Sequence, residues 1–160
     1  MRISDDEKVA RILSSEWVEN GRILQTAFQL RAGETYLSVN RPAIDTYIED
    51  IRTFVTNHST YCCHGEYYRR ALLNVGDIRE IKISHDALSV AAEVEVEPRN
   101  IHIRSHAGIF TRYKGRNLKQ GQLIKASGTG NNVSTDSILL ELRYLLRQKA
   151  TLEKCLLQKA

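Results

Sequence analysis

The stretch NIHIRSHAGIFTRYKGR, residues 100–116, holds the densest group of side chains that could do chemistry. It contains two histidines, four arginines or lysines and two aromatic residues, and it has no carboxylate. Histidine can act as an acid, a base or a metal ligand near neutral pH. Arginine and lysine contact phosphates, and aromatic rings offer stacking faces for unpaired bases. The stretch therefore indicates a catalytic strand, a metal site, a polyanion-binding surface or a solvated sheet edge.

The distribution of charge favours the polyanion-binding surface. Residues 98–135 contain seven arginines and lysines and no aspartate or glutamate, so their net charge is +7. The whole chain carries +4, so subtracting seven leaves −3 on the remainder. A basic segment on a mildly acidic body predicts contact with nucleic acid or an acidic protein, and a solvated basic edge is the alternative. The predicted binding residues are Arg104, His106, Phe110, Arg112, Tyr113, Lys114, Arg116, Lys119 and Lys125.

Imidazole and thiol groups also gather at His58, Cys62, Cys63 and His64. Adjacent cysteines do not reproduce the C-x₂-C spacing of structural zinc sites, and no second ligand pair follows. Cysteine also packs as a small buried hydrophobic residue. We therefore predict no metal site, and no spacing of cysteine and histidine selects a nucleophile–base pair.

A small-residue loop, KASGTGNN at 125–132, has some features of a phosphate cradle. Glycines before a helix N-terminus can bind an anion. The residue order is not that of a Walker A motif, and Asp136 in the first turn would repel an anion. We predict a loop followed by a helix that Ser134 or Thr135 caps.

Length and composition predict one α+β domain over residues 1–160. The chain has 42% hydrophobic and 26% charged residues, which is ordinary for a globular protein with a core. It has no apolar run long enough to span a bilayer, and its N-terminus is acidic where a signal peptide is basic. Three cysteines, an odd number, do not suit a secreted disulfide framework. We expect a cytoplasmic protein with reduced thiols.

Hydrophobic periodicity and turn residues predict the elements that position these groups. Ser4 and Glu7 match a capping box, and Val9, Ile12 and Leu13 fall on one helical face. The predicted elements are a helix over 5–14, strands over 16–19 and 22–29 joined at Asn20-Gly21, a strand over 35–40, a helix over 43–58, a helical or irregular segment over 59–74, strands over 80–83, 90–97 and 101–106, and a helix over 136–158. We expect a mostly antiparallel sheet packed against the 43–58 helix and the long C-terminal helix.

Residues 16–41 resemble the opening of a group of small uncharacterised bacterial proteins. The matching residues are Gly21-Arg22, Thr26-Ala27-Phe28 and Leu37-Ser38-Val39, with a later His-Ala element at 106–109. This resemblance implies no activity.

A second similarity is to ADP-ribosyltransferase-like folds, which use an arginine or histidine on a first strand, a Tyr/Ser strand before a helix, and a later Glu-x-Glu. The matching positions are Arg22, Tyr36, Ser38 and Glu95 within the Glu-rich strand at 93–97. The resemblance implies an NAD-using enzyme in which these four residues are catalytic.

Our leading expectation is a non-enzymatic binding or assembly module of a bacterial multi-protein system. Its basic 98–125 surface would contact nucleic acid or an acidic protein partner without a cofactor. The C-terminal helix would mediate a homo- or hetero-oligomer, because its apolar stripe and basic face suit a partner helix. The ADP-ribosyltransferase-like enzyme is the alternative.

Overall fold

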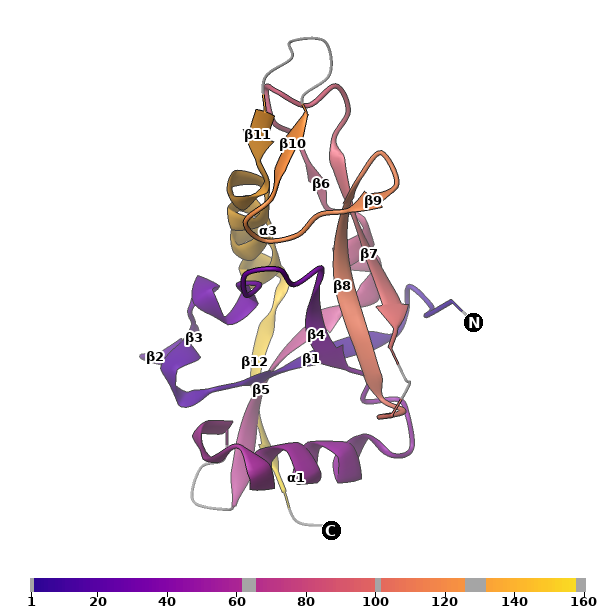
Figure 1. Cartoon of the computed structure of the whole chain (residues 1–160). Helices are drawn as coiled ribbons and strands as arrows, with labels where there is room; N and C mark the ends of the chain where they lie inside the picture. Colours follow the sequence, from indigo (N-terminus) through magenta and orange to yellow (C-terminus); the bar gives the residue numbers. More distant parts are fainter. Residues whose placement is uncertain (1, 62–65, 100–101, 126–131, 158–160) are drawn as a thin grey trace.

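A computed structural model describes the chain apart from residues 1, 62–65, 100–101, 126–131 and 158–160. The fold is α+β, as predicted, with a curled antiparallel sheet and three α-helices in the described part. Figure 1 shows α1 across one end of the molecule and α3, with the β10–β11 hairpin, towards the other. No helix among the described residues has the length and apolar character needed to cross a membrane.

The elements follow one another along the chain with short connections. They are β1 (Lys8–Leu13), η1 (Ser15–Trp17), β2 (Val18–Glu19), β3 (Arg22–Ile23), η2 (Gln25–Phe28), β4 (Tyr36–Asn40), α1 (Tyr47–Asn57), η3 (Ser59–Tyr61), β5 (Tyr67–Asn74), α2 (Val75–Arg79), β6 (Lys82–Ile83), β7 (Ala92–Pro98), β8 (His106–Tyr113), β9 (Arg116–Asn117), β10 (Leu123–Lys125), β11 (Asn132–Ser134), α3 (Thr135–Lys149) and β12 (Thr151–Leu156).

The main sheet has the strand order β12-β5-β1-β4-β8-β7-β6, and β9 pairs with β8. β1 pairs with β5 over its whole length, and β4 pairs with β8 over its whole length. Between β1 and β4, however, Ala10 and Asn40 form the single registered pair. The two halves of the sheet therefore separate beyond this point, and a seam opens between β1 and β4.

Two apolar clusters cover the two faces of the sheet. The larger contains Val9 and Leu13 of β1 together with the buried face of α3, and the smaller contains Ala10 and Ile12 of β1 together with the buried face of α1. A strand between two cores is apolar on both faces.

This double burial explains why the predicted helix over 5–14 is wrong. β1 occupies Lys8–Leu13, and Val9, Ile12 and Leu13 are buried on opposite faces of a strand. Their spacing of three and four residues matches a helix equally well. Glu7, expected in a capping box, instead pairs with Arg41 at 2.6 Å.

The predicted C-terminal helix over 136–158 is also wrong in its second half. α3 ends at Lys149, Ala150 takes an extended conformation, and β12 pairs antiparallel with β5. The open edge of β5 needs hydrogen-bond partners, and β12 supplies them. The helical surface expected to mediate assembly is therefore a sheet edge in this chain.

The basic stretch contains the third correction, because the strand lies at His106–Tyr113 and residues 102–105 are irregular. In the described part of the 59–74 segment, β5 is a strand where a helical or irregular segment was expected. The 16–29 segment contains two short strands flanked by 3₁₀ turns. α1 starts at Tyr47, after turns, rather than near Pro42.

Several local predictions are confirmed. Asn20 and Gly21 have φ of 51° and 73°, as in a type I′ hairpin turn. β4 lies within the predicted strand over 35–40, and β7 overlaps the predicted strand over 90–97 and ends one residue later. Ser134 caps α3 by accepting from the Asp136 backbone N–H.

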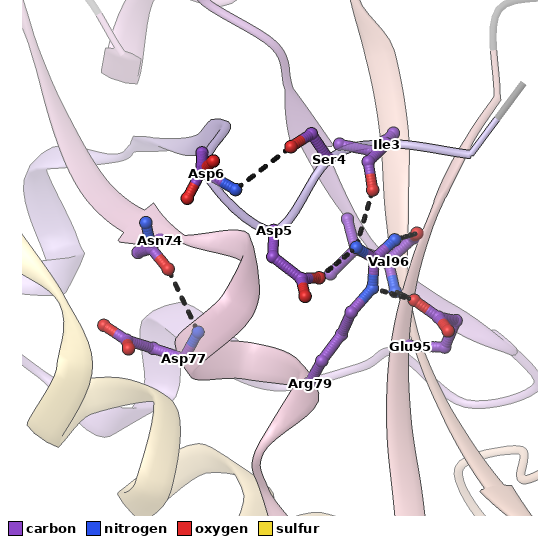
Figure 2. Close-up of polar contacts among 9 residues, drawn as sticks. All are labelled: Ile3, Ser4, Asp5, Asp6, Asn74, Asp77, Arg79, Glu95 and Val96. Carbon is purple, nitrogen blue, oxygen red and sulfur yellow. Dashed lines mark hydrogen bonds and ion pairs between the residues drawn. The ribbon is translucent and has the colours of Figure 1, made fainter.

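Arg79 at the end of α2 ties the N-terminal segment to β7 (Figure 2). Its guanidinium donates to the carbonyls of Ile3 (2.6 Å) and Val96 (3.1 Å) and pairs with Asp5 and Glu95. The bond from Arg79 lowers the pKa of Asp5. Arg79 thus stabilises the contact between three segments that are distant in sequence.

Replacing Arg79 should therefore destabilise the fold far more than replacing an exposed partner of an ion pair. The Arg79 side chain is 9% exposed, whereas Lys82 and Glu93 are 54% and 69% exposed. We expect Arg79→Gln to lower the free energy of unfolding by about 2–4 kcal/mol and Lys82→Gln by less than about 1 kcal/mol. Urea unfolding measures both, and equal losses would contradict this role of Arg79.

Candidate functional site

The seam between β1 and β4 opens into a cavity of about 500 Å³. Its walls come from β1, β4, η1, α1, η3 and the segments around η2 and before β8. The volume lies within the range of small-molecule sites. The half-buried polar residues of its lining include Arg11, Ser38, Asn40, Asp50 and His106.

Arg11 occupies the seam where β1 and β4 no longer pair. Its Nε donates to the carbonyl of Ala27 (3.1 Å) and its Nη1 to the carbonyl of Ser38 (2.8 Å). The guanidinium also lies 5.0 Å from the ring centroid of Trp17. Burial lowers the pKa of Arg11 to about 10. A positive charge therefore lies in the cavity wall, hydrogen-bonded to neutral carbonyl groups.

Aromatic rings form the wall beside Arg11. Trp17 packs edge-on against Tyr61 at 5.7 Å between ring centroids, and Phe54 packs against Tyr61 at 4.8 Å. All three residues line the cavity. Edge-to-face packing of this kind holds flat apolar surfaces in place.

Ser38 and His106 meet across the β4–β8 pair. His106 is in register with Asn40, so Ser38 is its diagonal neighbour on the same face. Ser38 Oγ lies 2.5 Å from His106 Nε2. A hydroxyl and an imidazole that are 68 residues apart in the chain are thus hydrogen-bonded in the cavity wall.

The surroundings of His106 favour its neutral form. Burial lowers the pKa of His106, while a backbone hydrogen bond with Arg99 acts in the opposite direction and is outweighed. Tyr36 packs 6.0 Å from the imidazole and 5.1 Å from the Phe110 ring, measured between centroids. This packing requires Gly108, because a Cβ there would lie 2.6 Å from Cδ2 of Tyr36.

A chain of hydrogen bonds fixes the segment before His106. Ser105 is fully buried, and its Oγ donates to Asp50 of α1 (2.6 Å) and accepts from Asn40 (3.0 Å). Thr46 also donates to Asp50 Oδ2, at 3.0 Å. α1 therefore positions His106 through Ser105, and protein donors satisfy the carboxylate of Asp50.

The ADP-ribosyltransferase-like set is not assembled into one cleft. Ser38 lines the cavity, but Arg22 is exposed on the small β2–β3 hairpin. Glu95 lines a different hollow and points toward Arg79 (Figure 2). Tyr36 and Glu95 are both in register with Phe110, so a strand separates them by about 10 Å.

The predicted basic surface is only partly a surface. Phe110 and Tyr113 are 4% and 7% exposed, so the expectation that they stack on bases is wrong. They lie in β8, which has neighbours on both sides. Arg112 pairs with Glu97, and Arg104 pairs with Asp45 at 2.9 Å. The side chains that remain exposed on the turn and strands beyond are Lys114, Arg116, Lys119 and Lys125.

The two segments that the sequence analysis weighs as a metal site and as a phosphate cradle lie largely outside the described residues. Cys62, Cys63 and His64 are outside the described residues, as is 126–131 of the glycine-rich loop. In the described part of the chain, no group of three or more His, Cys, Asp or Glu side chains is arranged to hold a metal ion.

Sequence reasoning missed Arg11, the aromatic wall and the pairing of Ser38 with His106. Ser38 belongs to the predicted ADP-ribosyltransferase-like set and His106 to the predicted basic surface. No local sequence signal indicates that two strands so far apart in the chain will pair. Arg11 did leave a signal, since it is the one charged residue within VARIL, an otherwise apolar strand. A charge in a doubly buried strand requires a partner or a function.

Comparisons with known proteins return nothing for this chain: no family model matches, and neither the curated proteins nor the solved structures include a significant match. Function must therefore be argued from the site itself.

The lowered pKa of His106 predicts a pH effect on stability. The imidazole of His106 binds a proton near pH 6.5 in the unfolded chain and only at lower pH in the folded chain. The contribution of neutral His106 to the free energy of unfolding is therefore complete above pH 6.5 and is lost as the pH falls. We expect the free energy of unfolding to fall less steeply below pH 6.5 in His106→Gln, by at most about 1.4 kcal/mol per pH unit. Urea unfolding at several pH values tests this, and parallel curves would refute it.

Proposed function

We propose that this protein binds a small anionic molecule with a flat apolar part in the cavity between β1 and β4. The observation that carries the proposal is the Arg11 guanidinium, which lies in the cavity wall and is hydrogen-bonded to two backbone carbonyls. Those bonds use Nε and Nη1, and Nη2 takes part in neither.

Electrostatics support an anion at this position. The carbonyls of Ala27 and Ser38 are dipoles without net charge. The described residues give Arg11 no ion pair, and the Glu34 carboxylate attracts its charge from a greater distance. Two carboxylates also line the cavity. Asp50 is satisfied by Ser105 and Thr46, and Glu34, which is exposed, accepts from the Arg31 backbone N–H at 2.5 Å. A carboxylate or phosphate beside Arg11 would gain a charge-assisted hydrogen bond in a partly desolvated site.

The aromatic residues of the cavity wall are the evidence that part of the ligand is flat and apolar. Tyr61 packs edge-on against both Trp17 and Phe54, and all three residues line the same cavity as Arg11. Small-molecule sites combine mainly apolar walls with a few polar groups that set orientation.

Two matched probes test this function, indole-3-carboxylate and its neutral analogue indole-3-carboxamide. We expect the carboxylate to bind at least about 10-fold more tightly, as one charge-assisted hydrogen bond allows. Arg11→Gln should reduce the difference to less than about twofold, Arg11→Lys should keep part of it, and Arg22→Gln, at an exposed arginine, should not change it. Chemical-shift titration measures the affinities. Failure of both probes to bind, or equal affinities in the wild type, would overturn the proposal.

A second candidate function is polyanion binding by the exposed cations Lys114, Arg116, Lys119 and Lys125. They lie along one continuous stretch from the β8–β9 turn to β10, and this stretch contains no carboxylate. Cations alone, without exposed aromatic rings, favour contact with a phosphate backbone in a sequence-independent way.

Anisotropy of labelled single-stranded DNA at about 50 and 200 mM salt tests this second function. Neutralisation of four phosphates on a single strand predicts an affinity loss of roughly 50-fold between these conditions. Changing the four residues to Gln should abolish binding. Changing Lys8, Arg22, Arg147 and Lys154 to Gln removes the same charge elsewhere and should have little effect. Equal losses in both variants would show that net charge alone matters.

A further inference from the structure

We propose that Ser38 and His106 form a nucleophile–base pair that cleaves a small carboxylic ester bound in the β1–β4 cavity. The inference extends the proposed function, because the same cavity would hold the substrate. It rests on the hydroxyl–imidazole contact and on the groups that fix it.

The distance and position of the two side chains suit nucleophilic catalysis. Such a pair needs a hydroxyl within hydrogen-bond reach of a base, and a third group that orients the base. Ser38 Oγ and His106 Nε2 are 2.5 Å apart, and both residues line the cavity. The substrate would therefore meet the hydroxyl without any rearrangement of the sheet.

The backbone of Arg99 supplies the orienting group. Its hydrogen bond with the imidazole favours the protonated ring, as a carbonyl that accepts from a ring N–H does. In the neutral ring, the tautomer with its proton on Nδ1 leaves Nε2, which faces Ser38, able to accept the Ser38 proton. Burial keeps the ring neutral near pH 7.

Arg11 adds a positive charge beside the backbone of the nucleophilic residue. Its Nη1 donates to the backbone carbonyl of Ser38 itself at 2.8 Å. A cation in a partly desolvated wall stabilises negative charge that develops on a reacting oxygen. Arg11 therefore serves both ligand binding and the developing oxyanion.

The reaction has two steps. Ser38 Oγ attacks the carbonyl carbon of the ester while its proton moves to His106 Nε2, and a tetrahedral oxyanion forms. The oxyanion collapses, the bond to the leaving alcohol breaks, and His106 returns the proton to that alcohol. Water, deprotonated by His106, then attacks the acyl-Ser38 ester. The bond between the acyl carbon and Ser38 Oγ breaks, His106 returns the proton to that oxygen, and the acid and free serine are released.

A small fluorophosphonate probe without net charge tests the pair directly, because an activated serine displaces fluoride from the phosphorus and is phosphonylated irreversibly. We expect intact-protein and peptide mass spectrometry to place one adduct on Ser38. His106→Gln should lower the labelling rate constant at least about 100-fold. Ser89 is a matched control: it is exposed, and its hydroxyl bonds to Tyr113 rather than to a histidine. Ser89→Ala should label at the wild-type rate.

The pH dependence of labelling in the wild-type protein tests the base without a substitution. The rate should rise with pH and level off above a midpoint below 6.5, since burial lowers the pKa of His106. A structural hydrogen bond would not produce this profile. No adduct on Ser38 at millimolar probe, or labelling independent of His106 and of pH, would overturn the inference.

The neutral probe also separates this inference from the proposed function. Labelling of Ser38 without carboxylate binding would keep the catalytic pair and reject the anionic ligand. Carboxylate binding without labelling would keep the ligand site and reject the catalytic pair.

Discussion

The hydrogen bonds from Arg11 to the carbonyls of Ser38 and Ala27 hold the open seam of the sheet. β1 and β4 share one registered pair, at Ala10 and Asn40. Beyond this pair the Arg11 guanidinium, and not a neighbouring strand, donates hydrogen bonds to the carbonyls of Ser38 and Ala27. A shorter side chain could not reach both carbonyls from β1. The separation of the strands, the cavity between them and the positive charge in its wall thus depend on one residue.

This arrangement places a charge where a strand would otherwise be apolar. Burying a guanidinium with neutral partners costs free energy, and the lowered pKa of Arg11 expresses that cost. Arg79 shows the contrast, since it pairs with Asp5 and Glu95 in addition to two carbonyls. Arg79 pairs with carboxylates within the protein and stabilises it, whereas the hydrogen bonds of Arg11 go to backbone carbonyls.

Local signals predicted those elements whose conformation is set by nearby residues. The alternation of valine and glutamate in β7, the Asn20-Gly21 turn and the Ser134 cap each act within a few residues, and each is confirmed. Periodicity failed for β1, because burial on both faces reproduces helical spacing. It failed again beyond Lys149, where an apolar pattern typical of a continued helix belongs to a strand that pairs with β5.

The sequence by itself determined the α+β class, the antiparallel strands and the basic character of the segment from 98 to 135. Tertiary structure alone decided that Phe110 and Tyr113 are buried, that Glu95 faces Arg79, and that Ser38 faces His106. The physical reason is that periodicity reports how deeply each residue is buried, whereas strand order and register decide which buried residues meet. The local sequence around a residue does not indicate which residue will be its neighbour across the sheet.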